Sequence, residues 1–153
     1  MALDTMVTEK QLVVFDLSAE AYGVDIGSVR EIISMQDITK VPETPAFVEG
    51  IIDLRGKVIP VVDLRKKFGL PEVERDKDNR IVVVDIAGQD IGVVVDAVNE
   101  VLRVPSNSVE PPSSIITTVD SEYLLGIAKL EDYLIILLDL ERLLSSIENI
   151  TDY

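Results

Sequence analysis

Apolar residues, mostly Val, Ile and Leu, stand in short runs along this chain rather than at helical spacing. Turn-forming residues separate the runs, for example at Ser18-Ala19-Glu20, Arg55-Gly56, Ala87-Gly88-Gln89 and Glu131-Asp132. Many short strands between such turns are typical of β-barrels and sandwiches. The runs predict ten strands: Gln11–Leu17, Ala21–Ile26, Ile38–Val41, Phe47–Leu54, Lys57–Leu64, Arg80–Ala87, Asp90–Ala97, Val101–Val104, Leu124–Leu130 and Tyr133–Leu138.

Helix signals occur in three segments. Ser28 and Glu31 have the spacing of a capping box, which predicts a helix beginning at Ser28. Arg65–Leu70 predicts a single turn, because Gly69 and Pro71 would stop it. A C-terminal helix is expected over about 139–149, capped by Asp139. Its apolar stripe is formed by Leu140, Leu143, Leu144 and Ile147.

The chain also contains an internal repeat. Residues 13–32 align without a gap on residues 82–101, at an offset of 69 (82 − 13), and residues 50–66 align on 126–142, at an offset of 76 (126 − 50). Glycines and aspartates fall in register, which chance agreement among aliphatic residues does not explain. The identical pairs are Val13/Val82, Val14/Val83, Asp16/Asp85, Gly23/Gly92, Val24/Val93, Val29/Val98, Glu31/Glu100, Gly50/Gly126, Ile51/Ile127, Leu54/Leu130, Ile59/Ile135, Asp63/Asp139 and Leu64/Leu140.

The repeat predicts a mainly β protein that consists of two homologous halves. Subdomain 1 spans about 11–70 and subdomain 2 about 80–138, each with about five strands followed by a helix. The segment 71–79 is charged and poor in apolar residues, so it is expected to link the halves. Each half is small for independent stability, so the two should pack through an apolar seam.

Composition restricts the chemistry. The 153 residues include neither Cys nor His, which excludes disulfides, Cys nucleophiles, thiolate or imidazole metal ligands and Ser-His-Asp catalysis. The net charge of −14 argues against binding nucleic acid, which requires Lys and Arg to neutralise phosphates. No apolar run approaches the ~20 residues that span a bilayer, and Met1–Lys10 has no features of a signal peptide. A cytoplasmic protein that binds other proteins, through their basic patches or neutral apolar grooves, is expected.

The repeat serves as an internal control, because features in both halves are expected to serve the fold. Gly23 and Gly92 are therefore interpreted as positions of close backbone approach. The pair Arg55-Gly56 has no counterpart, since Glu131-Asp132 occupies the matching turn. Arg55 could thus contact a partner or be a solvated turn residue. Pro60 matches Ile136, and a proline there predicts an exposed strand edge or a bulge.

Enzymatic alternatives have little support in the spacing of residues. The stretch from Asp76 to Asn79 resembles the start of a calcium loop, but the Gly and Glu required at its sixth and twelfth positions are replaced by Ile81 and Ala87. No phosphate-binding loop or nucleophile elbow is present. A small acidic, metal-dependent hydrolase stays open, because two of the many carboxylates could converge. A generic SH3-like peptide binder would need a groove lined by aromatics, and the chain has three Phe, four Tyr and no Trp.

Three stretches of the sequence resemble the CheW family of bacterial and archaeal chemotaxis coupling proteins. They are Val13–Leu17 continuing through Tyr22–Ile26 and Val29–Ile32, the longer Thr44–Arg65, and Ile91–Asp96. The likeness runs from about Gln11 to Ile147, and the Asp53-Leu54-Arg55-Gly56 hairpin before Ile-Pro-Val-Val-Asp-Leu is its most specific part. Asp53 stands where the family commonly has Asn.

The resemblance implies two SH3-like, five-stranded β-barrels and an adaptor without catalytic residues, cofactor or metal. The same module occurs inside the histidine kinase and ahead of a receiver domain, and a free-standing adaptor is expected because it fits the length best. It implies binding to the regulatory domain of a CheA-type histidine kinase and to the cytoplasmic tip of a chemoreceptor (a methyl-accepting chemotaxis protein). The protein would be recruited to membrane-associated receptor arrays without inserting into the membrane. The implied receptor-binding residues are Glu31, Gly50, Arg55, Gly56 and Gly92, and the implied kinase-binding residues are Val14, Ile26, Val29 and Ile32.

Overall fold

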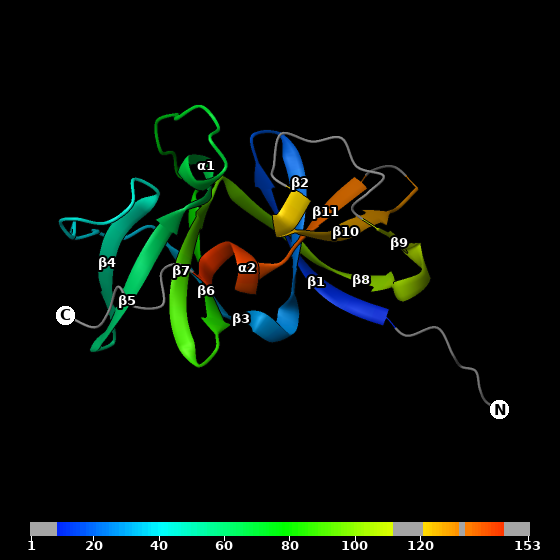
Figure 1. The fold of residues 1–153 in the computed structure, drawn as a ribbon, viewed down its shortest axis with the longest axis horizontal. Coiled ribbons are helices and arrows are strands. Elements are labelled where there is room, and N and C mark those ends of the chain that lie inside the picture. Colours follow the sequence, from blue (N-terminus) through cyan, green and yellow to red (C-terminus); the bar gives the residue numbers. More distant parts are fainter. Residues whose placement is uncertain (1–8, 112–120, 132–133, 146–153) are drawn as a thin grey trace.

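The computed structural model describes residues 9–111, 121–131 and 134–145, and the fold is mainly β as predicted (Figure 1). The strands are β1 (Glu9–Leu17), β2 (Glu20–Asp25), β3 (Val29–Ser34), β4 (Val48–Leu54), β5 (Lys57–Asp63), β6 (Arg80–Ile86), β7 (Gln89–Val95), β8 (Ala97–Pro105), β9 (Val109–Glu110), β10 (Leu124–Lys129) and β11 (Leu134–Leu138). The helices are α1 (Leu64–Lys67) and α2 (Leu140–Leu144), with short 3₁₀ turns η2 (Ile26–Ser28), η3 (Ser106–Ser108) and η5 (Ser121–Tyr123). Among the helices of these described ranges, none is long and apolar enough to cross a membrane.

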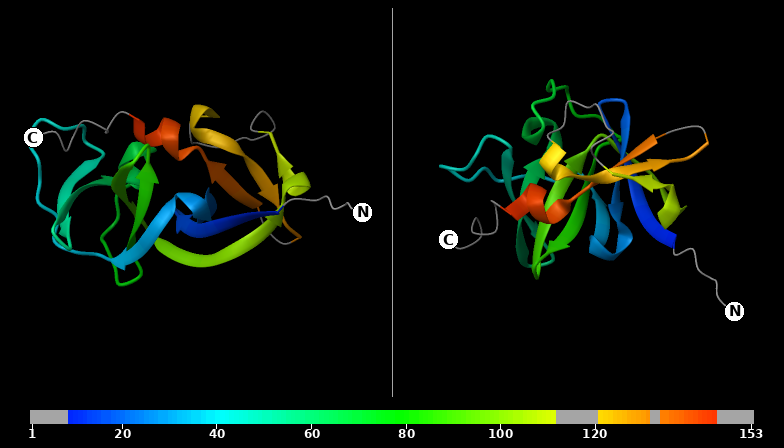
Figure 2. Two further views of the ribbon diagram at one scale, coloured as in Figure 1. Left: turned by 90° about the horizontal axis from the view of Figure 1, so that it is seen from below. Right: turned by 45° about the vertical axis from the view of Figure 1, so that its right-hand side comes forward.

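The strands form two sheets that lie side by side along the long axis (Figures 1 and 2). Sheet A has six strands in the order β8-β1-β2-β11-β10-β9, and sheet B has five in the order β3-β6-β7-β5-β4. Each sheet therefore contains strands from both halves of the sequence. The predicted division into subdomains 11–70 and 80–138 does not match this pairing, because long-range pairing between strands rather than chain order decides sheet membership.

The way in which the two halves contribute strands to both sheets follows the sequence repeat. The hairpin β1–β2 belongs to the first half but pairs with β8 and β11 of the second, and the equivalent hairpin β6–β7 pairs with β3 and β5 of the first. The parallel contacts have the same register, because Gly92 faces Val61 in sheet B and Gly23 faces Leu137 in sheet A. The two halves have therefore exchanged their first hairpins, which the alignment alone does not reveal.

Three apolar clusters receive the side chains that point to alternate faces of the strands. Leu12 and Val14 of β1 point into a cluster enclosed by sheet A, and Ile81 and Val83 of β6 point into the corresponding cluster of sheet B. The alternate side chains, such as Val13, face a third and larger cluster that both sheets share with α2. This third cluster is the apolar seam that the repeat predicted. Each sheet thus wraps around its own core and buries its other face against its neighbour.

The capping box at Ser28 does not begin a helix. Residues Ile26–Ser28 form a single 3₁₀ turn, and β3 follows at Val29 and pairs with β6. The β3–β6 ladder shifts register between Val29 and Glu31. Half-buried and exposed positions still alternate along β3, but Glu31 is half-buried and Ile32 is exposed, so polar and apolar residues do not follow the alternation and the strand was hidden in the sequence pattern. Pairing with β6 and the β-branched residues of this segment overrode the capping signal.

Two smaller strand predictions also need correction. Instead of a strand over Ile38–Val41, the structure has one isolated bridge, between Thr39 and Ile51. Pro60 lies at neither an exposed edge nor a bulge: it is buried in β5, which lies between β7 and β4, and the bulge of the β4–β5 ladder lies beside Gly50. Pairing of β5 with β7 starts one residue later, at Val61, so the missing N–H of the proline falls outside that ladder.

The two remaining helices lie at the predicted places, each after an aspartate cap, although α1 spans Leu64–Lys67 where the sequence predicted a turn over Arg65–Leu70. Asp63 accepts a hydrogen bond from the N–H of Arg65, and Asp139 from the N–H of Arg142. Helix α2 buries Leu140, Leu143 and Leu144 in the seam, as its stripe predicted. The fourth residue of that stripe, Ile147, and the predicted extension of the helix to about residue 149 lie outside the described residues.

Candidate protein-interaction site

The hairpin between β4 and β5 turns through Arg55 and Gly56, which both have left-handed backbone angles (φ 53° and 86°). This is the geometry of a two-residue hairpin turn matched to the twist of its strands. The carboxylate of Asp53 accepts a hydrogen bond from the N–H of Gly56 at 2.8 Å. The turn is therefore fixed, and it presents the Arg55 side chain at the tip of the hairpin.

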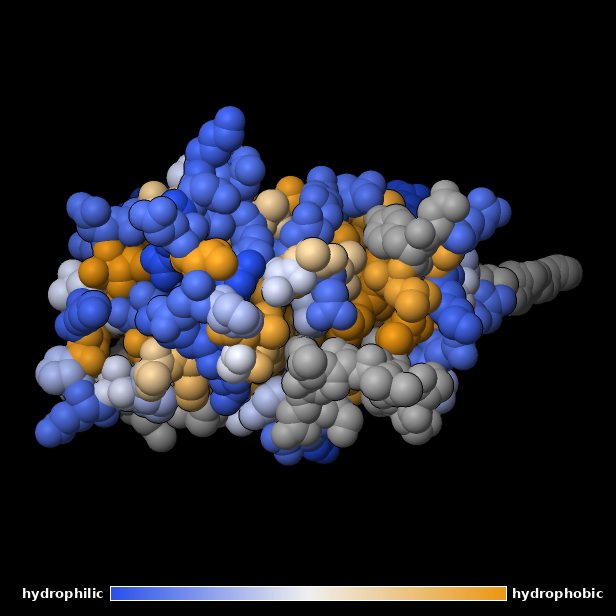
Figure 3. Space-filling view, turned by 90° about the horizontal axis from the view of Figure 1, so that it is seen from above, coloured by the Kyte–Doolittle hydropathy of each residue, from blue (hydrophilic) through white to orange (hydrophobic). Residues whose placement is uncertain are grey.

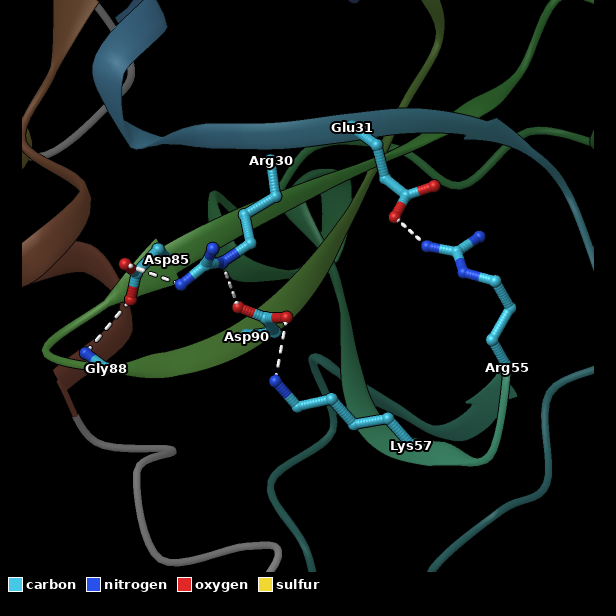
Figure 4. A network of polar contacts seen from close by, with 7 residues as sticks. All are labelled: Arg30, Glu31, Arg55, Lys57, Asp85, Gly88 and Asp90. Carbon is cyan, nitrogen blue, oxygen red and sulfur yellow. Dashed lines mark hydrogen bonds and ion pairs between the residues drawn. The ribbon is translucent and has the colours of Figure 1, made fainter.

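Arg55 pairs with Glu31 on the edge strand β3, where its guanidinium donates a hydrogen bond to the carboxylate (Figure 4). Two of the predicted receptor-binding residues, from opposite edges of sheet B, thus lie together. The Arg55 side chain stays 69% exposed. The pair therefore leaves most of the guanidinium accessible to a partner.

A polar network lies beside this pair and joins β3, β5 and the β6–β7 hairpin (Figure 4). Asp90, whose side chain is only 10% exposed, accepts hydrogen bonds from Arg30 at 2.7 Å and from Lys57 at 3.0 Å. Arg30 also donates to Asp85 at 3.1 Å. Burial alone would raise the pKa of Asp90, but the hydrogen bonds from Lys57 and Arg30 outweigh it and hold that pKa below its ordinary value.

Sequence reasoning missed Arg30, Lys57 and Asp90, although the repeat carried a signal. At the repeat offset Arg30 matches Asn99 and Asp90 matches Ala21. One contact is common to both halves, since Asn99 donates to Asp16 at 2.7 Å where Arg30 donates to Asp85. A search for polar residues whose counterpart in the other half is apolar would have identified Asp90.

Three of the residues implied by the resemblance lie inside the protein. Val14 is fully buried in the core of sheet A. Gly50 and Gly92 are also buried, and a Cβ added at Gly50 would lie 2.1 Å from the carbonyl oxygen of Thr39. Because these three positions are buried, they present little surface to a partner. Gly56, by contrast, is exposed in the turn.

The other implied kinase-binding residues lie on or just before β3. Ile26 in η2 and Val29 at the start of β3 are half-buried against the seam, whereas Ile32 is 40% exposed. On β8, the equivalent strand of sheet A, Val101 is likewise 50% exposed and Val98 packs against the seam. Exposed apolar side chains thus flank the seam on both sheets.

A second polar cluster surrounds Asp96, where the chain passes from sheet B to sheet A. Arg65 donates two hydrogen bonds to this carboxylate, at 2.9 and 2.6 Å, and the N–H of Ser18 donates a third at 2.9 Å. Burial would raise the pKa of Asp96, but the hydrogen bonds from Arg65 and Ser18 outweigh it and lower that pKa. The linker is tied to the same point, because buried Asn79 donates to the Asp96 carbonyl at 3.1 Å.

The carboxylates that converge in this region are each paired with a cation. They line a hollow of about 220 Å³, where Glu49 pairs with Lys66 at 2.7 Å and Asp63 with Arg75 at 3.3 Å. Over the part of the chain that the structure describes, no group of three or more acidic side chains is arranged to hold a metal ion. The acidic side chains named here are thus balanced by cations of the same fold.

Known proteins of one family resemble this chain over most of its length. Residues 11–148 match the family described as CheW-like domain. The chemotaxis protein CheW of Klebsiella aerogenes is 36% identical over 139 residues, which cover 91% of this chain and 84% of that protein. The CheW of Treponema pallidum is 35% identical over 142 residues, covering 90% and 84%. The crystal structure of the scaffolding protein TtCheW from Thermoanaerobacter tengcongensis superposes with a TM-score of 0.83 at 50% identity, covering 89% of this chain and 92% of that one.

Proposed function

Because the chain belongs to the CheW-like family of chemotaxis scaffold proteins, we propose that it couples chemoreceptors to a CheA-type histidine kinase without catalysing a reaction itself. In this role it binds the cytoplasmic tip of a methyl-accepting chemotaxis protein and the regulatory domain of the kinase. Recruitment from the cytoplasm to receptor arrays at the membrane follows from the first of these contacts.

The observation that carries the proposal is the Arg55 hairpin. It is specific to one half of the repeat, its backbone is fixed by Asp53, and its cation is mostly exposed beside Glu31. A planar guanidinium in a fixed position recognises a carboxylate or a backbone carbonyl with defined geometry. Arg55, Gly56 and Glu31 are therefore proposed to contact the receptor and to fix its register.

The apolar residues of β3 are proposed to bind the kinase. Ile32 is exposed, and Ile26 and Val29 are half-buried next to it, so this strand offers apolar contact area at the rim of the seam. Val14, Gly50 and Gly92 are proposed to support both contacts indirectly, by maintaining the two cores and the sheet geometry.

Replacing Arg55 by Glu tests the role of the hairpin. The Arg55–Glu31 ion pair is exposed to solvent and contributes little to folding, so the Arg55→Glu variant should fold and bind the kinase normally. Its carboxylate would face both Glu31 and the receptor, and receptor-dependent control of kinase activity should fall by about tenfold or more. The measurement is kinase autophosphorylation in membranes that contain receptor, kinase and this protein.

The double variant Glu31→Arg/Arg55→Glu separates partner contact from a purely internal role. It restores an ion pair of reversed polarity but leaves no cation at the hairpin tip. Continued loss of receptor control is expected if Arg55 contacts the receptor. Full recovery in the double variant, or normal coupling by Arg55→Glu alone, would show that Arg55 does not fix the receptor contact.

A further inference from the structure

The carboxylate of Asp90 joins the two elements that carry the Arg55–Glu31 pair. Its Oδ1 accepts a hydrogen bond from Nε of Arg30 at 2.7 Å, and its Oδ2 accepts one from Nζ of Lys57 at 3.0 Å. Arg30 directly precedes Glu31 on β3, and Lys57 directly follows the two-residue turn of the β4–β5 hairpin. One carboxylate therefore links the hairpin to β3 beside the exposed pair (Figure 4).

The backbone ladders are interrupted on both strands at the point where Asp90 holds them. Strand β5 pairs with β7 from Val61 onward, so in the ladders that the structure describes residues 57–60 are joined to β4 but not to β7. On β3, Arg30 lies where the register against β6 shifts. The side-chain bonds of Asp90 therefore connect the strands where these ladders have gaps.

Asp90 is the buried member of this network. Its side chain is only 10% exposed, whereas those of Arg30 and Lys57 are both more than half exposed. Water weakens a charge-assisted hydrogen bond to a buried carboxylate less than it weakens an ion pair at the surface. The Arg55–Glu31 pair is of the second kind. The bonds to Asp90 are therefore the stronger of the two links between the hairpin and β3.

The charges of this link occur in one sheet alone. The residues that match Arg30, Lys57 and Asp90 in the repeat are Asn99, Tyr133 and Ala21, all of them uncharged. The turn that carries Arg55 has no counterpart either, since Glu131-Asp132 occupies the matching positions. The link and the turn are thus confined to the same sheet, as expected if the link serves the Arg55 site rather than the fold that both halves share.

We propose that Asp90 is a positioning residue: through its two cation partners it sets where the Arg55 hairpin stands against β3, and thereby sets the contact with the receptor. This inference rests on the receptor contact proposed for Arg55. Asp90 is itself buried, so it acts through the hairpin rather than by touching the partner. Without its charge, the exposed Arg55–Glu31 pair alone would hold the tip of the hairpin to β3, and the tip would move.

A second carboxylate, near the other end of β5, provides a matched control. Asp96 also accepts hydrogen bonds from a cation, two of them from Arg65 on α1. Strand β5 begins next to the turn and ends at α1, and its seven residues span roughly 20 Å at 3.3 Å per residue. Helix α1 lies on the side that is seen from above, where hydrophilic side chains alternate with apolar areas (Figure 3). Asp96→Asn should thus weaken the fold without moving the Arg55 hairpin.

Backbone order parameters, measured by NMR relaxation of the isotope-labelled full chain, test the positioning without any partner. In the parent protein the amides of Arg55 and Gly56 should have values of about 0.85, typical of rigid backbone. In Asp90→Asn they should fall towards about 0.6, whereas Asp96→Asn should leave them unchanged. Lys57→Gln removes the same link at an exposed position, so it should cause the same fall, and it replaces Asp90→Asn if that variant does not fold.

Receptor binding tests the consequence of the positioning. Asp90→Asn should bind receptor-containing membranes about fivefold more weakly than the parent protein, and Asp96→Asn should bind like the parent. Added to Arg55→Ala, Asp90→Asn should cause no further loss of binding, because it acts through the hairpin that carries Arg55. A general loss of stability would instead add to the effect of Arg55→Ala.

Several outcomes would overturn the proposal. These are order parameters that are already low in the parent protein, that stay unchanged in Asp90→Asn and Lys57→Gln, or that fall equally in Asp96→Asn. Receptor binding that Asp90→Asn leaves intact, or losses that add to those of Arg55→Ala, would overturn it as well. A parent protein that does not bind receptor would instead refute the proposed function, and the order parameters would still decide whether Asp90 positions the hairpin. The two proposals therefore fail separately.

Discussion

The glycines near the candidate site differ in what surrounds them. A Cβ added at Gly56 would meet no atom within 4 Å, although its φ of 86° disfavours other residues. At Gly50, where φ is 144°, a Cβ would lie 2.1 Å from the carbonyl oxygen of Thr39. At Gly92 it would lie 2.8 Å from a methyl carbon of Ile81. Only Gly56 is free to change without disturbing a core.

Replacing each glycine by alanine should therefore lower the unfolding free energy by different amounts. Gly56→Ala is expected to cost about 1–2 kcal/mol of unfolding free energy, because the turn tolerates the side chain with backbone strain. Gly50→Ala is expected to cost about 3 kcal/mol or more, since strain and a backbone clash add. Urea unfolding of both variants measures the difference. Equal losses would contradict the expected clash at Gly50, and a Gly50→Ala protein that is as stable as the parent but fails to couple would contradict its indirect role.

For the glycines, the internal repeat predicted the structural role more directly than the family resemblance did. Gly23 and Gly92 occur in register, which predicted close packing, and an added Cβ at Gly23 would lie 2.9 Å from Ile135. The resemblance alone assigned Gly92 to receptor binding, and the structure buries it, so the effect proposed for it is indirect. Arg55 was predicted as a candidate partner contact because the other half of the repeat has no counterpart. Its pairing with Glu31 could not be predicted, since it depends on how the edges of sheet B meet.

At the scale of elements, local signals predicted hairpins and helix caps better than edge strands. The hairpins β4–β5 and β6–β7 and the predicted cap Asp139 depend on residues close in sequence. Strand β3 depends on pairing with β6, about 50 residues away, and its polar and apolar residues do not follow its alternation of half-buried and exposed positions. The Asp90 network likewise joins three elements and could not be assembled from local patterns.

Helix α1 and the β7–β8 junction are joined by Arg65 and Asp96, and this link should depend on pH. The folded-state pKa of Asp96 lies below its ordinary value, so its stabilisation is complete above the unfolded pKa of about 4 and is lost as pH falls through the folded pKa. Asp96→Asn should lose about 1.5–3 kcal/mol at pH 7, typical of hydrogen bonds to charged groups. The difference from the parent protein should shrink below about pH 4. Urea unfolding across this range measures it, and a difference that stays constant to low pH would contradict a charged link.

At the scale of the molecule, the repeat predicted two similar halves with a shared seam but not the exchange of their first hairpins. Exchange leaves the local sequence of every strand unchanged, so only the pairing partners reveal it. Its consequence is that neither half contains a complete sheet. Sheet A takes β1 and β2 from the first half, and sheet B takes β6 and β7 from the second.

Separating the halves tests this interdependence. Fragments 1–75 and 76–153, cut within the predicted linker, should each lack cooperative unfolding, because each exposes its side of the seam to water. An equimolar mixture should regain strand circular dichroism and a cooperative transition. Cooperative unfolding of either fragment alone would show instead that its own first hairpin can replace the exchanged one.

The central claim, that this protein joins receptor and kinase, can be tested by sedimenting receptor-containing membranes with the purified kinase. With the full chain present, the kinase should sediment with the receptor and its autophosphorylation should respond to receptor ligand. Without the chain, both effects should be absent or strongly reduced. Equal sedimentation and equal ligand response with and without the protein would contradict the coupling function.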